Sequence, residues 1–243
     1  MTNAHPTSTQ VDEIADGIYR ISSPVDALPG GFTFNQFLID DEAPLLFHTG
    51  PRALFGATRA AVATVLPVER LRYVALSHFE ADECGALSEF LAAAPDAVPV
   101  CSRVAAMTSV NDQAARPAKA LADGERLELG RRTVEWYDTP HLPHGWECGY
   151  LGELSTKTLF CGDLFTQPGA GMAAVTDGDI LGPSEAMRSQ MDYFAHAPNT
   201  AALLERLAST EPKTLACMHG SAWRGDGAQL LRALGDALAT RGS

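Results

Sequence analysis

A short acidic segment, SHFEADECG at residues 77–85, places one histidine and three acids within six consecutive residues. Its candidate ligands are His78, Glu80, Asp82 and Glu83. Imidazole nitrogens and carboxylate oxygens suit first-row metal ions. The segment directly follows the apolar run 71–76, so we expect a buried strand to end where these side chains begin. Acids in this position indicate a site for a positive charge.

Three later segments share this design, in which an apolar strand ends in a loop that carries a histidine or an acid. They are 138–144 with His141 and His144, 159–163 with Asp163, and 215–220 with His219. Strand ends on one edge of a sheet converge, so the four loops are predicted to meet in space. Taken alone, the acidic segment could instead be a solvated loop that caps a helix, because carboxylates favour helix N-termini. The four matching segments together favour a metal site.

The charge of these loops indicates more than one ion. Glu80, Asp82 and Asp163, with Glu83 nearby, bring at least three negative charges into one cavity. Left uncompensated, that charge would raise the pKa values of the carboxyl groups sharply. Two cations bridged by one carboxylate would balance the set.

The order of these residues resembles the metallo-β-lactamase superfamily. The pattern is His78-x-Glu80-x-Asp82, a histidine after a hairpin, Gly162-Asp163 and then His219-Gly220. The resemblance covers essentially the whole chain and implies an α/β (α+β) fold, a four-layer αββα sandwich with a dinuclear site along one edge. Hydrolytic members usually carry histidine in place of Glu80. His-x-Glu-x-Asp followed by Gly85-Ala-Leu87 is more similar to the β-lactamase-like domain of flavodiiron proteins and to the related oxygen-binding diiron proteins.

This resemblance implies a ligand set. One iron would be held by His78, Glu80 and a histidine of the third loop. A second would be held by Asp82 and His219, and Asp163 would bridge both. The His-x-Pro register of the family favours His141 as the third-loop ligand and puts His144 beside the ligands, although the opposite assignment stays open. A carboxylate in place of an imidazole makes the site harder and more anionic, so we expect two iron ions, with zinc or manganese as alternatives.

Two further positions depart from the family pattern. Glu83 stands where flavodiiron proteins have a histidine, and it could bind the second metal, accept a hydrogen bond or point away. His48, in the segment 45–50, stands where the superfamily usually has aspartate. It could bond to a ligand or to substrate, or be an ordinary buried histidine.

Flavodiiron proteins also attach a flavodoxin-like domain. Because we find no flavin-binding segment here, we expect no bound flavin and an external electron-donor protein.

The elements that must position these residues alternate between strands and helices. Strands are expected at 17–21, 33–40, 44–47, 71–76, 98–101, 125–129, 133–137, 149–154, 158–161 and 214–218, and helices at 52–66, 85–94, 184–196, 200–209 and 227–241. This alternation of strands and helices predicts two β-rich halves flanked by helices. We expect one domain over residues 1–243, with residues 1–10 flexible.

Composition narrows the classes of protein. The net charge of −12, from 30 acids and 18 bases, argues against binding to a nucleic acid backbone. The sequence has neither a long apolar run nor a secretory signal, so we expect a cytoplasmic protein without a membrane partner. The five cysteines are odd in number and are expected to be thiols.

Three functions are compatible with this pattern. The leading hypothesis is a non-haem diiron protein that binds or reduces O2, NO or peroxide with electrons from a partner. The first alternative is a zinc- or iron-dependent hydrolase, in which a metal-bound hydroxide attacks its substrate. The second is a diiron oxygen sensor without turnover. A homodimer remains open.

Overall fold

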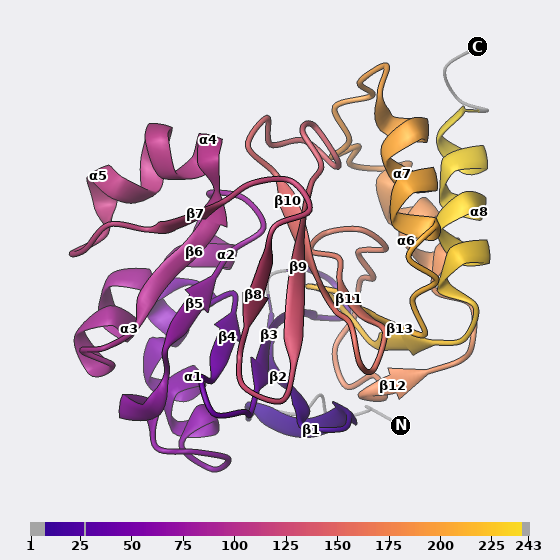
Figure 1. Ribbon diagram of the computed structural model, residues 1–243. Coiled ribbons are helices and arrows are strands. Elements are labelled where there is room, and N and C mark those ends of the chain that lie inside the picture. Colours follow the sequence, from indigo (N-terminus) through magenta and orange to yellow (C-terminus); the bar gives the residue numbers. More distant parts are fainter. Residues whose placement is uncertain (1–7, 27, 240–243) are drawn as a thin grey trace.

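Two seven-stranded β-sheets face each other in the computed structural model, which describes residues 8–26 and 28–239 (Figure 1). Sheet A has the order β1-β2-β3-β4-β5-β6-β7. Its strands are β1 (Gln10–Ala15), β2 (Ile18–Val25), β3 (Phe32–Ile39), β4 (Leu45–Phe47), β5 (Tyr73–Ala75), β6 (Val98–Ser102) and β7 (Lys119–Leu121). The pairs from β1 to β4 are antiparallel, and those from β4 to β7 are parallel.

Sheet B comes from the second half of the chain and has the order β12-β14-β13-β11-β10-β9-β8. Its strands are β8 (Arg126–Glu128), β9 (Thr133–Asp138), β10 (Gly149–Glu153), β11 (Thr158–Phe160), β12 (Val175–Thr176), β13 (Thr214–Ala216) and β14 (Ala222–Arg224). The central pair of β11 and β13 is parallel. Both sheets therefore have parallel strands whose carboxyl ends can carry functional loops.

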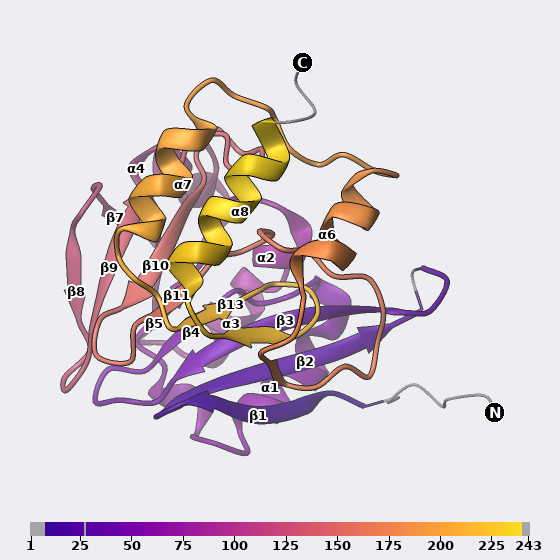
Figure 2. The same ribbon diagram turned by 90° about the vertical axis from the view of Figure 1, so that its right-hand side faces the viewer.

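Helices cover the outer faces of both sheets. Beside sheet A lie α1 (Phe55–Val62), α2 (Ala81–Cys84), α3 (Leu87–Ala93), α4 (Arg103–Ala105) and α5 (Asn111–Gln113), with short turns η1 (Arg52–Leu54), η2 (Val68–Arg70) and η3 (Ala106–Val110). Sheet B is covered by α6 (Leu181–Arg188), α7 (Thr200–Ala208) and α8 (Gly227–Ala239), which stand in front of it in Figure 2. The αββα arrangement expected from the sequence is confirmed.

Three apolar layers hold this arrangement together, and strand alternation explains them. In β4, Leu45 and Phe47 point into the layer between the sheets, whereas Leu46 points toward the helices of sheet A. In β11, Phe160 enters the central layer and Leu159 packs under the helices of sheet B. Both faces of these strands are buried, which is why their sequences are continuously apolar rather than alternating.

The element boundaries differ from the sequence predictions in several places. The helix expected at 184–196 is α6, which spans Leu181–Arg188 only. The strands β1, β7, β12 and β14 and the helices between 103 and 113 were not predicted. Of the segment expected to be flexible, Gln10 instead begins β1, and residues 1–7 lie outside the described residues. Within the described part of the chain, no helix is both long and apolar enough to span a membrane.

A buried carboxylate ties the two sheets together at the end away from the acidic loop. Asp41 lies in the turn between β3 and β4 and accepts backbone N–H bonds from Glu42 (2.9 Å), Arg131 (3.3 Å) and Arg132 (2.8 Å). The two arginines belong to the turn between β8 and β9. Burial raises the pKa of Asp41, but these hydrogen bonds outweigh burial and lower it below 3.8.

We expect Asp41→Asn to lower the free energy of unfolding by about 2 kcal/mol at pH 7, since hydrogen bonds to a charged group are lost. Because the folded-state pKa of Asp41 is depressed, its contribution is present above its ordinary value of 3.8 and is lost as the pH falls through the folded-state pKa. Urea unfolding at pH 7 and pH 3 measures the difference. Asp40→Asn is the matched control, and an equal loss in both variants would contradict the role of Asp41.

Candidate metal centre

The acidic segment and the loops of the second half meet at one edge of the two sheets. His78, Asp163 and His219 each stand three residues after the last residue of a strand, which is Ala75 of β5, Phe160 of β11 and Ala216 of β13. Phe160 and Ala216 are also paired in register across β11 and β13. Strand geometry therefore delivers Asp163 and His219 side by side. The loop between β9 and β10 adds His144.

Asp163 lies at the centre of the cluster, and its two oxygens face different histidines. Oδ2 lies 3.5 Å from Nε2 of His78 and 3.9 Å from Nε2 of His144. Oδ1 lies 3.3 Å from Nε2 of His219. A carboxylate whose oxygens point to two separate donor groups is placed to bridge two ions.

The remaining acids fall on either side of that bridge. Oε1 of Glu80 lies 2.9 Å from Nε2 of His144 and 3.8 Å from Nε2 of His78. On the other side, Oδ2 of Asp82 lies 3.5 Å from Nε2 of His219. The donor atoms of His78, His144 and Asp163 lie within 4.8 Å of one another, as do those of His78, Glu80 and Glu83.

All three histidines of the cluster use Nδ1 for a hydrogen bond and turn Nε2 inward. Nδ1 of His144 lies 2.8 Å from the carbonyl oxygen of Tyr193, and Nδ1 of His219 lies 2.8 Å from that of Thr33. Nδ1 of His78 lies 3.0 Å from the hydroxyl of Ser77. Histidines that bind metals usually have their other ring nitrogen held in this way. The carbonyl groups of Tyr193 and Thr33 could not be identified from the sequence as partners of these histidines, because every residue has a backbone carbonyl.

The structure does not bring His141 to this cluster. His141 is exposed and has a left-handed backbone, with φ of 67°. Its backbone N–H donates to the carbonyl of Gly145 (2.8 Å), which closes the loop and directs His144 inward. In this structure His144, and not the His141 expected from the sequence, turns its ring toward the cluster.

Glu83 is buried without a hydrogen-bond partner for its carboxylate in the described part of the chain. Its side chain has no exposed surface, and neither carboxylate oxygen has a hydrogen-bond partner among the described residues. Oε1 lies 3.9 Å from Nε2 of His78. Burial, with the charges of Asp163 and Asp82, raises the pKa of Glu83 well above its usual value. A buried carboxylate in this state is costly unless a cation is present.

The other groups of the cluster are paired electrostatically. Burial lowers the pKa of His144, but the hydrogen bond with Glu80 and the charge of Asp163 raise it to about 9. The same bond lowers the pKa of Glu80. Burial raises the pKa of Asp163, but His219 and the other histidines outweigh burial and hold it well below its usual range.

This donor set fits two metal ions. It contains four carboxylates, from Glu80, Asp82, Glu83 and Asp163, and three imidazoles, from His78, His144 and His219. Four negative charges balance two divalent cations. The orphaned oxygens of Glu83, and Oδ1 of Asp163, which also lacks a hydrogen-bond partner, lie where such cations would be bound.

Two aromatic residues of β3 pack against one of the histidines. The ring of Phe32 stacks on His219 with 4.4 Å between centroids, and Phe34 meets the same ring edge-on at 5.5 Å. Trp146 is 56% exposed at the surface, and Trp223 donates a hydrogen bond to the carbonyl of Gly178. The two phenylalanines of β3 were not predicted, because their strand lies far from the ligands in sequence.

Glu147 links two of the metal-site loops and was also missed. Its Oε1 accepts a hydrogen bond from the backbone N–H of Phe79 at 3.0 Å. The backbone carbonyl of Glu147 accepts a bond from the hydroxyl of Ser102 at 2.7 Å. Glu147 thus joins the loop after β5 to the loop that carries His144.

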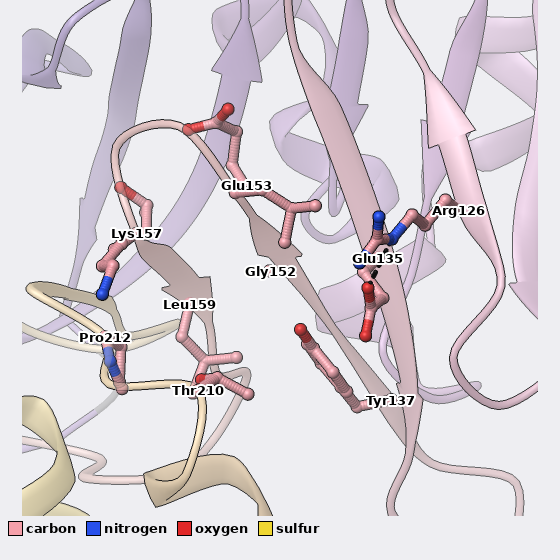
Figure 3. Close-up of a pocket in the computed structure, with 11 residues that line it drawn as sticks. Arg126, Glu135, Tyr137, Gly152, Glu153, Lys157, Leu159, Thr210 and Pro212 are labelled. Carbon is pink, nitrogen blue, oxygen red and sulfur yellow. Dashed lines mark hydrogen bonds and ion pairs between the residues drawn. The ribbon is translucent and has the colours of Figure 1, made fainter.

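A separate cavity of about 280 Å³ lies over β8 to β11, beside the turn after α7 (Figure 3). Its charged residues are already paired: Arg126 with Glu135 at 2.7 Å and Lys157 with Glu211 at 3.1 Å. It shares no residue with the metal cluster, and its composition does not indicate an anion site.

The chain is similar to known proteins over most of its length. Residues 32–220 match the family described as ODP family beta lactamase. A rubredoxin-oxygen oxidoreductase of Megalodesulfovibrio gigas is 29% identical over 215 residues, covering 81% of this chain and 50% of the relative. An anaerobic nitric oxide reductase flavorubredoxin of Salmonella arizonae is 24% identical, covering 83% of this chain and 43% of the relative. The chain thus spans about half the length of these relatives.

Solved structures show the same fold. The rubredoxin oxygen:oxidoreductase from Desulfovibrio gigas superposes with a TM-score of 0.81 at 25% identity, covering 93% of this chain and 62% of that one. A metal-soaked flavodiiron core from Synechocystis superposes with a TM-score of 0.84 at 23% identity, covering 96% of this chain and 61% of that one.

Because His144 faces the cluster and His141 does not, substitutions of these two histidines should affect metal affinity differently. His144→Ala should lower metal affinity at least tenfold, because a nitrogen ligand is lost, whereas His141→Ala should bind metal as the wild type does. Elemental analysis after dialysis against a chelator measures both. Loss of metal in the His141 variant alone would restore the assignment made from the sequence.

Glu83→Gln should act in opposite directions on stability and on metal binding. Without metal, replacing an unpaired buried carboxylate by an amide of the same shape should raise the melting temperature at pH 7. With metal, the lost charge should weaken binding by roughly tenfold or more. Scanning calorimetry and chelator competition measure the two effects. Unchanged affinity would show that Glu83 does not contribute to metal binding.

Proposed function

Because this chain belongs to the ODP family of β-lactamase-like proteins, we propose that it is a non-haem diiron oxidoreductase that reduces O2 or NO. The observation that carries the proposal is the carboxylate-rich cluster, in which Glu80 contacts His144 and Glu83 is buried without a hydrogen-bond partner among the residues that the structure describes. Four carboxylates and three imidazoles make a hard, anionic donor set, which favours iron over zinc. The relatives named as oxygen oxidoreductase and nitric oxide reductase point in the same direction.

The proposed ligands divide around Asp163. His78, Glu80 and His144 would hold one iron. Asp82 and His219 would hold the other, and Asp163 would bridge the two. Glu83 is proposed as an additional carboxylate ligand at the centre. Two irons held in this way would supply electrons to a small oxidant and share the charge of its reduction.

The residues around the ligands would orient them and limit access of water. Tyr193 and Thr33 hold His144 and His219 through their carbonyl groups, so both rings present Nε2 to the centre. Phe32 and Phe34 cover His219 on the side of β3. These contacts fix the donor atoms before any metal binds, which reduces the cost of assembling the centre.

Electron counting separates the two substrates. Coupling of two NO molecules to N2O and water consumes two electrons and two protons, and two ferrous ions held by these residues would supply the two electrons. Reduction of O2 to two waters consumes four electrons and four protons, so two more electrons must come from a donor. We propose that this donor is a separate electron-transfer protein or domain.

Iron content and single-turnover reactivity test the proposal. Protein expressed in iron-supplemented medium should contain about two irons per chain. After anaerobic reduction and removal of excess reductant, it should release about one N2O for each centre exposed to NO, measured by gas chromatography, because each centre stores two electrons. Asp163→Asn, which removes the bridging charge, should abolish both the iron and the N2O.

Other outcomes point to the alternative functions. A stable oxygen adduct without turnover in the presence of electron donor would indicate an oxygen sensor. Zinc alone, with no redox response and with metal-dependent hydrolysis of a thioester or lactone, would contradict the proposal and indicate a hydrolase.

A further inference from the structure

A chain of hydrogen bonds runs from the metal cluster into the protein interior. Nδ1 of His78 lies 3.0 Å from Oγ of Ser77, and that oxygen lies 3.0 Å from Nε2 of His48. Nδ1 of His48 lies 3.0 Å from Sδ of Met218. All four side chains are buried, with at most 1% of their surface exposed. No solvent contact competes with these bonds.

The partner of His78 differs in kind from the partners of the other two histidines. A carbonyl oxygen can only accept, so Tyr193 and Thr33 require His144 and His219 to donate from Nδ1. In a neutral ring, Nε2 is then free of a proton and can bind a metal. A hydroxyl can donate or accept, so Ser77 by itself leaves the proton of His78 undetermined.

The backbone resolves this ambiguity through His48. The N–H of Ser77 donates to Nε2 of His48 at 3.3 Å, so this nitrogen must carry a lone pair. The hydroxyl oxygen of Ser77 lies 3.0 Å from the same nitrogen, and two lone pairs at that distance would repel each other. The hydroxyl must therefore donate to His48, and its oxygen accepts from Nδ1 of His78. The proton on Nδ1 of His48 is directed to the sulfur of Met218.

We propose that His48 is a positioning residue which, through Ser77, keeps the proton of His78 on Nδ1 and leaves Nε2 as the metal-binding atom. The inference rests on the proposed metal centre and extends it to a residue that contacts no ligand directly. It also explains why the relay is built from a histidine. The imidazole of His48 accepts from Ser77 on one side and donates to Met218 on the other.

The backbone of His48 supports this role. Its φ of 66° is left-handed, a conformation that non-glycine residues adopt at a cost and that concentrates at functional sites. Its N–H donates to the carbonyl of Ala75 in β5 (2.7 Å), and its ring stacks on Phe47 with 4.1 Å between centroids. Burial lowers the pKa of His48 well below its ordinary value, so the ring is neutral at pH 7.

Variants at positions 48 and 77 test the relay through metal affinity. His48→Phe keeps a ring and removes the acceptor, and Ser77→Ala removes the hydroxyl. Each should weaken zinc binding by about ten- to a hundredfold, the usual effect of losing a group that orients a ligand. The double variant should lose little more than either single variant. His48→Gln, whose amide oxygen can take the place of Nε2, should restore most of the affinity.

Zinc affinity is measured by competition with a chelating indicator, which needs neither iron nor turnover. Ser23→Ala is the matched control, because Ser23 is a buried serine of β2 whose hydroxyl contacts Thr9. Circular dichroism establishes that each variant folds. If His48→Phe does not fold, Ser77→Ala and His48→Gln still decide the question. Wild-type affinity in Ser77→Ala, or no recovery in His48→Gln, would overturn the proposal.

Nitrogen-15 NMR of the zinc-loaded protein reads the tautomer directly, because without a cation the lone pairs on Nε2 of His78 and Nε2 of His144, which lie 3.0 Å apart, would repel each other. The wild type should show the Nδ1–H form of His78, and Ser77→Ala and His48→Phe should show the Nε2–H form in part or in full. A wild-type His78 protonated on Nε2 would exclude the relay. Absence of iron or of NO reduction would instead refute the proposed function and leave this result unaffected.

Discussion

The mutual repulsion of four carboxylates, crowded at the shared edge of two sheets, is the constraint on which the rest of the site depends. Glu83 shows the strength of this repulsion most clearly, because both of its oxygens are buried without a hydrogen-bond partner within the described ranges and its pKa is raised. Asp163 shows the opposite response, since the surrounding histidines hold its pKa low. The imidazoles balance part of the negative charge, and cations are needed to balance the rest. The cluster therefore indicates metal binding, whichever reaction the protein catalyses.

The fold meets this constraint with short, rigid strands. β5, β11 and β13 are three residues long, end in buried apolar residues and lie between buried layers, so the third residue after each strand has a defined place. Strands from both halves of the chain contribute, and neither half holds a complete donor set. The fold therefore holds like charges at fixed distances. The two packed sheets, the hydrogen bonds of the histidines and the link through Glu147 all contribute to this.

The sequence predicted the features that side-chain type and strand pattern encode. The αββα layers and the convergence of His78, Glu80, Asp82, Asp163 and His219 follow from apolar runs that end in histidines and acids. Which histidine of the third loop turns toward the cluster was not readable from the sequence, because the direction of a side chain in a loop depends on local backbone angles, here the positive φ of His141 and its bond to Gly145. The carbonyl groups that hold two of the histidines, and the relay through Ser77, involve atoms or long-range contacts that residue patterns do not report.

The order of the ligands along the chain has a consequence for biosynthesis. His78 and the acidic segment are made first, whereas Asp163 and His219 follow later strands, and His219 is added 141 positions after His78. At about 5–20 residues per second, this interval lasts roughly 7 to 28 s. Until His219 has been added, the nascent chain lacks part of the donor set. The proposed metal centre would therefore be complete only after β13 has joined β11, which would make metal acquisition one of the last steps in the maturation of the protein.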